Sequence, residues 1–157
     1  MSGIVNSAGS RSGVIGSTEI PGGYEEGVHV ATITPSTSGT VTMEGNYERL
    51  SYTKIGRQVT VTGQLIVSGV SSPVGYFKIS LPFVIGSSTN GGELRGCGSL
   101  TLADVASADS GGFVSRTNES TSYLMVYLGD GTTYQSDSAE QLAANAVVYL
   151  TFTYFTT

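Results

Sequence analysis

Apolar and polar residues alternate along most of this chain. In the segment RQVTVTGQLIV, from Arg57 to Val67, apolar side chains occupy every second position. A spacing of two is that of a pleated strand, in which neighbouring side chains point to opposite faces. The pattern predicts a strand that is buried on one face and wet on the other. Gly63, inside this segment, has no side chain to pack, which predicts a bulge or the close approach of a neighbouring backbone.

The same alternation recurs at short intervals, separated by residues that favour turns. Tripeptides such as Asn90-Gly91-Gly92, Ser110-Gly111-Gly112 and Gly129-Asp130-Gly131 supply the positive φ angles that tight reversals require. Many short strands at such intervals predict an all-β fold, an antiparallel β-sandwich or jelly roll. The other predicted strands are Val28–Thr34, Thr40–Glu44, Arg49–Ile55, Tyr76–Leu81, Glu93–Leu102, Phe113–Arg116, Ser122–Leu128 and Val147–Phe155.

One segment, Ser138–Asn145, has the composition of a helix. Its sequence SAEQLAAN combines residues that favour helix with Ser138 as a potential cap, and Glu140 falls in the first turn, near the positive end of the helix dipole. We expect two helical turns at most.

The last predicted strand, Val147–Phe155, is apolar or aromatic on both faces. One face carries Val148 and every second residue after it, and the other carries Val147, Tyr149 and Phe155. Two interpretations fit. The strand lies centrally in the sandwich, or its second face is buried by another subunit. The second interpretation makes Val147, Tyr149 and Phe155 candidate residues of an oligomer interface, and we expect a homo-oligomer, most simply a trimer.

The first 23 residues differ from the rest in composition. They are rich in glycine and serine, which predicts an extended N-terminal arm (residues 1–23) ahead of a β-sandwich domain (residues 24–157). Pure linkers seldom contain apolar pairs, yet this arm has Ile4-Val5 and Val14-Ile15. These four residues are candidates for docking on a partner, and the alternative is plain disorder.

Charge and length narrow the classes of partner. The chain has 157 residues, a formal net charge of −5 and only 12% charged residues. A negative chain gains little from the counterion release that drives binding to phosphate backbones, so we expect no nucleic acid partner. No apolar run is long enough to span a bilayer and no signal peptide is recognisable, so we expect a protein made in a cytosol, with no membrane partner.

The residues that usually carry catalysis or bind metals are scarce. His29 lies in an alternating stretch, where we expect it to face solvent, and Cys97 is expected to be a small, partly buried strand residue. Neither has a partner for nucleophilic catalysis. The carboxylates are scattered without a pair that suggests a glycosidase, and the loop aspartates lack the alternating pattern of a calcium loop. We therefore predict a non-enzyme with no catalytic residues, no cofactor and no metal.

Three short motifs occur in a recognisable order. Tyr24-Glu25-Glu26-Gly27 is followed by Tyr52-Thr53-Lys54-Ile55-Gly56-Arg57-Gln58-Val59 and then by Leu81-Pro82-Phe83. This arrangement resembles a module common in proteins of tailed bacteriophages, and the arm segment 6–16 resembles the leader that often precedes that module. The resemblance covers residues 6–83. One departure is Val28-His29-Val30-Ala31, where the family often has Thr-Trp-Thr-Pro.

The resemblance implies a β-sandwich that assembles into a virion, commonly as a trimer, in fibres, spikes or capsid decorations. Two hypotheses follow. In the first, the chain is a capsid decoration (cement) protein that docks through its arm on the major capsid protein or other virion proteins. In the second, it is the receptor-binding tip of a tail fibre or spike, with the loops at 86–92 and 129–134 contacting host surface glycan. The matched residues themselves are expected to build the fold, so no catalytic role is carried over to them.

Overall fold

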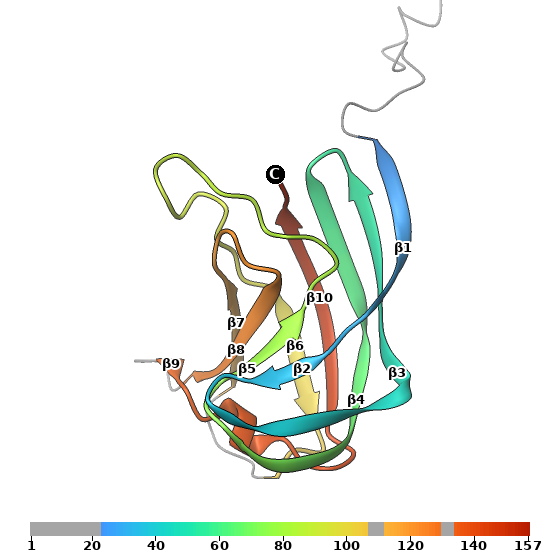
Figure 1. Ribbon diagram of the computed structural model, residues 1–157, viewed down its shortest axis with the longest axis vertical. Coiled ribbons are helices and arrows are strands. Elements are labelled where there is room, and N and C mark those ends of the chain that lie inside the picture. The colour runs from blue at the N-terminus through green and yellow to red at the C-terminus, as the bar shows by residue number, and fades with distance from the viewer. Residues whose placement is uncertain (1–22, 107–111, 130–133) are drawn as a thin grey trace, which may run out of the picture.

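Two antiparallel β-sheets face each other in the computed structural model, which describes residues 23–106, 112–129 and 134–157 (Figure 1). The first sheet has the order β1-β3-β4-β10-β6, and the second has the order β2-β5-β8-β7, with β9 paired to β8. The predicted all-β sandwich is therefore confirmed. The strands are β1 (Tyr24–Val30), β2 (Ile33–Pro35), β3 (Ser38–Ile55), β4 (Gln58–Val74), β5 (Phe77–Ser80), β6 (Ser99–Ala103), β7 (Phe113–Thr117), β8 (Tyr123–Gly129), β9 (Tyr134–Gln135) and β10 (Val147–Phe155).

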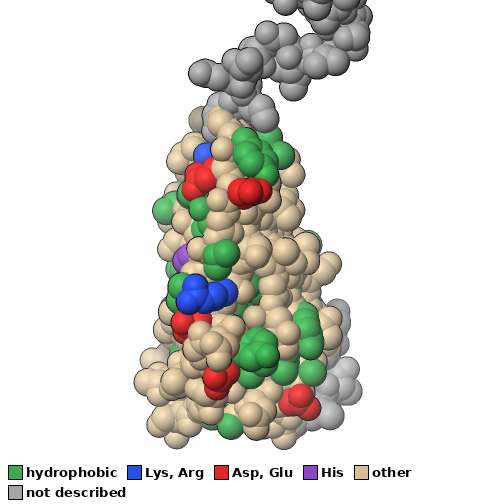
Figure 2. All heavy atoms as spheres, turned by 90° about the vertical axis from the view of Figure 1, so that its right-hand side faces the viewer, with side chains coloured by type: hydrophobic (Ala, Val, Ile, Leu, Met, Phe, Trp, Pro, Cys, Tyr) green, Lys and Arg blue, Asp and Glu red, His purple; other side chains and the backbone are tan. Residues whose placement is uncertain are grey.

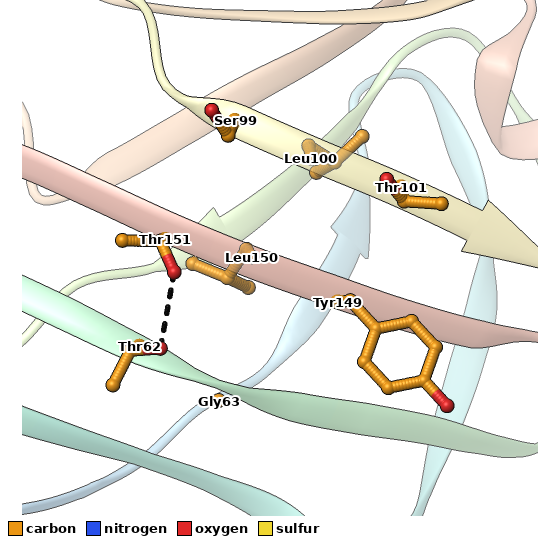
Figure 3. Close-up of a pocket in the computed structure, with 8 residues that line it drawn as sticks. All are labelled: Thr62, Gly63, Ser99, Leu100, Thr101, Tyr149, Leu150 and Thr151. Atoms are coloured by element: carbon orange, nitrogen blue, oxygen red, sulfur yellow. Dashed lines mark hydrogen bonds between the residues drawn. The ribbon is translucent and has the colours of Figure 1, made fainter.

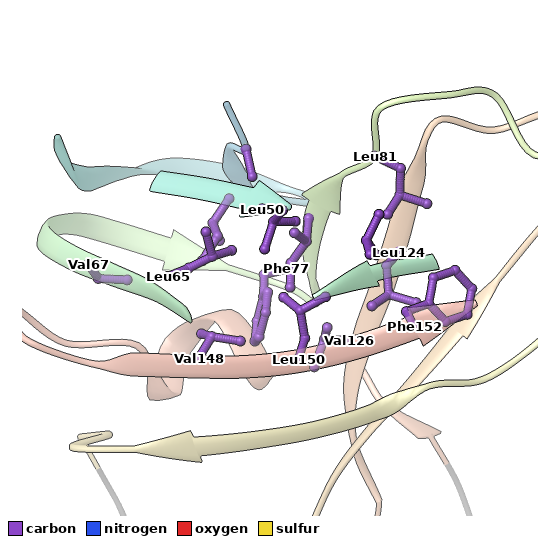
Figure 4. Packing of buried hydrophobic residues seen from close by; sticks show 14 of the residues in the cluster. Leu50, Leu65, Val67, Phe77, Leu81, Leu124, Val126, Val148, Leu150 and Phe152 are labelled. Carbon is purple, nitrogen blue, oxygen red and sulfur yellow. The ribbon is translucent and has the colours of Figure 1, made fainter. Parts of the chain in front are cut away.

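The core lies between the two sheets and takes the inward residue of each alternating pair (Figure 4). Leu50, Phe77 and Phe152 are among its largest fully buried side chains. Burial of each such side chain contributes roughly 1.5–3 kcal/mol, so the alternation read from the sequence also accounts for the stability of the sandwich. Tyr154 reaches the same core, and its hydroxyl bonds the backbone of Phe83 at 3.2 Å. Burial raises the pKa of Tyr154 to about 12.

The hairpin that joins β3 to β4 has the predicted form. Ile55 pairs with Gln58, and Gly56 makes the reversal with a φ of +60°. Gly63 resolves the choice between a bulge and a close approach, because its pairing with Leu50 is in regular register. A Cβ at this position would lie 2.8 Å from Leu50 Cδ2 and 3.0 Å from the Arg49 carbonyl oxygen. Gly63 is therefore present because β3 comes too close for any side chain.

Two predicted strand boundaries were wrong. The segments Thr40–Glu44 and Arg49–Ile55 belong to the single strand β3, and its pairing jumps from Met43–Val67 to Glu48–Leu65. The extra residues between these pairs interrupt the regular pairing. They also interrupt the alternation of apolar and polar residues, so one strand was predicted as two. Conversely, Val28–Thr34 divides into β1 and β2, because the chain leaves the first sheet after Val30 and enters the second at Ile33.

The predicted strand Glu93–Leu102 was also too long. Only Ser99–Ala103 pairs, as β6, and most of the residues between Gly86 and Gly98 form a loop outside the strands. The short strand β9 was not predicted at all. Tyr76–Leu81, Phe113–Arg116, Ser122–Leu128 and Val147–Phe155 agree with β5, β7, β8 and β10 to within one residue at each end.

The predicted helix shrinks to one 3₁₀ turn, η1 (Ser138–Gln141). Ser138 does not cap it. Instead, the buried Ser138 hydroxyl donates to the Val126 carbonyl oxygen at 2.6 Å and accepts a hydrogen bond from the Phe77 N–H at 3.3 Å. Helix propensity was outweighed here because the serine is used to attach the turn to β5 and β8, the two inner strands of the second sheet.

Candidate functional site

The outer face of the first sheet is a candidate association surface, which we call the β10 face. It is built from residues that alternate with the core residues along the five strands of this sheet. Across the strands they form the rows Tyr24–Ile55–Gln58–Phe155, Glu26–Thr53–Thr60–Thr153, Val28–Ser51–Thr62–Thr151–Ser99 and Val30–Arg49–Gln64–Tyr149–Thr101. Within these rows only Glu26 and Arg49 carry a charge. The face is therefore nearly neutral, which favours contact with another neutral surface.

Hydroxyl groups cross-link the middle of this face. Thr60 and Thr153 bond through their Oγ1 atoms at 2.9 Å, and Thr62 and Thr151 do so at 3.1 Å. Paired threonines on neighbouring strands stabilise a sheet and hold each other's rotamers. Because each hydroxyl satisfies its neighbour, covering this face with another protein costs less desolvation than covering free hydroxyls would.

A shallow hollow of about 370 Å³ lies between two of these rows (Figure 3). Tyr149 lines one side and Thr62, Thr151 and Ser99 line the other. Its floor is the row of Gly63, Leu150 and Leu100, whose side chains, where present, belong to the inward set. The hollow contains no charged or nucleophilic constellation. Its geometry suits the insertion of a small side chain or loop rather than a reaction.

Large apolar side chains interrupt the polar face. Tyr149 is 48% exposed and Phe155 is 45% exposed. Tyr24, Val28, Val30 and Ile55 are also exposed, and the first three lie on the edge strand β1. Figure 2 looks on the side of the molecule where β1 and β3 lie, and hydrophobic side chains are scattered there among uncharged polar atoms and several acidic and basic side chains. Such residues would be buried if a partner covered the face.

The predicted interface residues therefore have different positions. Tyr149 and Phe155 lie on the β10 face and are open to solvent, whereas Val147 is only 9% exposed and contributes little surface. β10 is an interior strand between β4 and β6, with Val148, Leu150, Phe152 and Tyr154 in the core. The described residues leave Tyr149 and Phe155 on its second face exposed, and the interpretation that a partner covers this face stays a prediction. The four candidate docking residues of the arm, Ile4, Val5, Val14 and Ile15, lie outside the described residues.

The three sequence motifs meet at one end of the sandwich. Tyr52 donates a hydrogen bond from its hydroxyl to Glu25 Oε1 at 2.8 Å, and its ring contacts Phe83 edge-on, with centroids 5.2 Å apart. Lys54 lies over the Phe83 ring at 5.7 Å. A Cβ on Gly27 would lie 2.7 Å from the Tyr52 hydroxyl, which explains the glycine. These contacts give the motif residues a packing role.

His29 departs from the prediction that it faces solvent. It shares a row with the core residue Leu50, and its Nε2 lies 3.0 Å from the Ser80 hydroxyl. Partial burial lowers the pKa of His29. This histidine links the first sheet to the second at their edge, in the stretch where the phage module often has tryptophan.

Glu119 has a structural role that the sequence did not reveal. Its Oε1 accepts hydrogen bonds from the Ser88 hydroxyl at 2.7 Å, the Gly92 N–H at 2.8 Å and the Leu94 N–H at 3.0 Å. The Leu94 backbone bond, with support from Ser88, lowers the pKa of Glu119 to about 2. The carboxylate thus organises the long loop before β6. These three partner residues gave no local signal, because they lie far from Glu119 in sequence.

The remaining candidates for chemistry are sparse. Cys97 is an exposed free thiol in a loop, whereas we had expected it in a strand and partly buried. Among the described residues, no three His, Cys, Asp or Glu side chains come together as potential metal ligands. In the same part of the chain, no helix has the length and apolarity needed to cross a membrane.

Comparison with known proteins gives a match in structure but not in sequence. No protein-family model matches the chain, and no curated protein matches it. Among solved structures, the crystal structure of the Dettilon tailspike protein (gp208) is similar, with a TM-score of 0.68 and 16% sequence identity. The match covers 84% of this chain and 24% of the tailspike chain, so this chain spans about a quarter of that protein's length. At this identity the likeness shows a shared fold.

Proposed function

We propose that this chain is a structural protein of a bacteriophage particle that works by docking and self-association rather than by catalysis. The observation that carries the proposal is the structural match, which extends over 84% of the chain and shows that its fold is similar to part of a tailspike. The motif resemblance supports the same class from different information, because it rests on residue identities and not on the path of the backbone.

Self-association would use the β10 face. Its near neutrality avoids repulsion between two copies of a chain with net charge −5, and burial of Tyr149 and Phe155 would stabilise the assembly. In a homo-oligomer the same contact repeats around the symmetry axis, so a modest interface is sufficient. A trimer is the assembly that we expect.

Two positions within the particle fit the chain. Capsid decoration is supported by the arm, whose four apolar residues could dock on the major capsid protein or another virion protein. A spike or fibre position, with contact to host surface glycan, is supported by the tailspike match, because 24% of that chain is the size of one module in a longer assembly.

Incorporation into particles tests the arm directly. The full chain and a variant in which Ile4, Val5, Val14 and Ile15 are all replaced by Ser are added to particles that lack the protein. If the arm docks, the variant keeps its circular dichroism spectrum but binds much more weakly. Equal binding of the two proteins would exclude the arm as the docking element. The attachment site would then lie on the sandwich, and the spike position would be favoured.

The non-catalytic part of the proposal is tested by assays on host polysaccharide. We expect no hydrolysis, and no effect when His29 or Cys97 is replaced by Ala, because neither belongs to a set of groups that could do chemistry. Turnover that a single Asp or Glu substitution abolishes would overturn this part of the proposal.

A further inference from the structure

The outer face of the second sheet, opposite the β10 face, carries a group of tyrosines and cations that the proposed structural role leaves unexplained. Its residues are Tyr76, Lys78, Arg116, Tyr123, Tyr127 and Tyr134, from β5, β7, β8, β9 and the residue before β5. We call this group the tyrosine face. In Figure 1 these strands form the layer that faces away from β3 and β4.

The tyrosine rings pack against one another at one end of this face. Tyr76 and Tyr127 stack with centroids 4.6 Å apart, and Tyr127 and Tyr134 are 5.6 Å apart. Tyr127 is largely buried by its neighbours, whereas Tyr134 is 61% exposed. The result is an aromatic platform whose inner ring is fixed and whose outer ring is accessible.

Arg116 is held in place by this platform. Its guanidinium carbon lies 5.2 Å from the Tyr127 ring centroid and 5.3 Å from that of Tyr134. Its Nε atom is buried and has no hydrogen-bond partner among the residues that the structure describes. Arginine stacked on aromatic rings keeps its planar donors oriented, and such donors match the geometry of carboxylate, sulfate or phosphate groups.

A second cation continues the face along the sheet. Lys78 and Arg116 both pair with Met125, from opposite sides, so their Cα atoms are roughly 10 Å apart. Lys78 Nζ lies 5.3 Å from the Tyr123 ring centroid. Tyr123 and Tyr127 are four residues apart on one face of β8, or about 13 Å. The face therefore has two pairs of a ring and a cation, Lys78 with Tyr123 and Arg116 with Tyr127, on the two sides of Met125.

We propose that the tyrosine face binds an acidic polysaccharide, with Arg116 and Lys78 contacting its anionic groups and Tyr134 and Tyr123 contacting its sugar rings. The repeated pairing of ring and cation matches a chain of sugars that carries repeated negative charges. Two cations are too few for tight binding to a nucleic acid backbone, because that affinity comes from the neutralisation of many phosphates. This inference rests on the spike or fibre position of the proposed function, in which the chain contacts host surface glycan, and it names the class of glycan and the surface that binds it.

The test measures binding of the full chain by titration calorimetry at low salt. The probes are polygalacturonate and dextran sulfate, which carry carboxylates and sulfates, with neutral galactan and dextran as counterparts and a single-stranded DNA oligonucleotide as a different polyanion. We expect binding to at least one acidic sugar polymer, weaker binding as salt increases, and none to its neutral counterpart. Comparison of the two acidic probes shows whether the face binds carboxylate or sulfate groups.

Three variants assign the binding to this face. Arg116→Met keeps an apolar stem against the rings but removes the charge, and Tyr134→Ala removes the exposed ring. Lys54→Met removes a positive charge that also lies over an aromatic ring, Phe83, but outside both named faces, and is the matched control. We expect Arg116→Met to weaken binding by about tenfold or more and Lys54→Met to leave it unchanged, with melting curves showing that all three fold.

Several outcomes would overturn the proposal. These are no binding to either acidic polymer, equal binding to the neutral ones, equal losses in Arg116→Met and Lys54→Met, or tighter binding to the oligonucleotide that Arg116→Met abolishes. None of them would affect incorporation of the chain into particles, so this proposal and the proposed function fail separately.

Discussion

Some single residues of this protein have structural roles that their residue type alone does not indicate. Glu119 is the single acid between Asp109 and Asp130 in the sequence, yet it fixes a loop through backbone and hydroxyl donors from Ser88, Gly92 and Leu94. Gly63 is a small residue in a strand, yet it allows two strands to approach. Each role depends on short contacts of one side chain or backbone position, and one substitution tests it.

Replacement of Glu119 by Gln should loosen the loop at 86–96 while leaving the sandwich folded. The amide keeps the size of the side chain but loses the charge-assisted hydrogen bonds. Hydrogen exchange should increase in this loop and remain unchanged in β10. Unchanged protection throughout would show that Glu119 does not organise the loop.

The same residue makes part of the stability depend on pH. The folded pKa of Glu119, about 2, lies below its ordinary value of 4.5. Its contribution is therefore fully present above pH 4.5 and is lost as the pH falls from there through about 2. The difference in melting temperature between the native chain and Glu119→Gln should shrink over this window. A difference that stays constant down to pH 2 would contradict the assignment.

Gly63→Ala should destabilise the protein by about 1–3 kcal/mol, because the new Cβ would overlap Leu50 and the Arg49 carbonyl. Gly69→Ala is the matched control in the same strand, since a Cβ there would meet nothing within 4 Å. Denaturant unfolding of both variants measures the difference. Equal stabilities for the two would show that β3 can move away at little cost.

At the scale of elements, strands with one wet face were predictable and their exceptions were not. The alternation in β4 and β10 follows from burial against the opposite sheet, so it appears in the sequence. The irregularity of β3 near Glu48, the crossing from β1 to β2 and the short pairing of β9 depend on contacts between distant segments. The hydrogen bonds from Gly92 and Leu94 to Glu119 also join distant segments. They hold the residues around Glu93 in a loop, where the alternation predicted a strand.

The candidate association surface was predictable in part. Tyr149 and Phe155 stood out because an interior strand has no need for apolar residues on its outer face. Val147 matched the same pattern but is covered by its own chain. The tyrosine face had no sequence signal, because its rings come from separate strands and meet only after the second sheet has formed.

Ser138→Ala tests how η1 is attached. The substitution leaves the Phe77 N–H without its side-chain acceptor and the Val126 carbonyl without its donor in a buried position. We expect a loss of about 1–3 kcal/mol in the free energy of unfolding, although alanine favours helix more than serine does. Glu140→Ala, an exposed change in the same turn, is the control. A stabilised Ser138→Ala variant would mean that local helix propensity dominates here.

For the whole molecule, the β10 face should determine the oligomeric state. We expect Tyr149→Thr combined with Phe155→Thr to shift the purified protein toward monomer, because these side chains are exposed in the single chain and threonine matches their neighbours. Tyr47→Thr, at a similarly exposed tyrosine of β3 outside the four rows, should leave the assembly unchanged. Light scattering after size exclusion gives the mass of each. A native chain that is monomeric at tens of micromolar would count against self-association.

The central claim is that this chain is a structural part of a phage particle, and cryo-electron microscopy of purified particles tests it most directly. The account predicts repeated copies of the sandwich in the reconstruction, at symmetry positions of the shell or at the tail. The β10 face should be buried between copies. Particles whose reconstruction and protein content lack this chain, although infected cells produce it, would contradict the account.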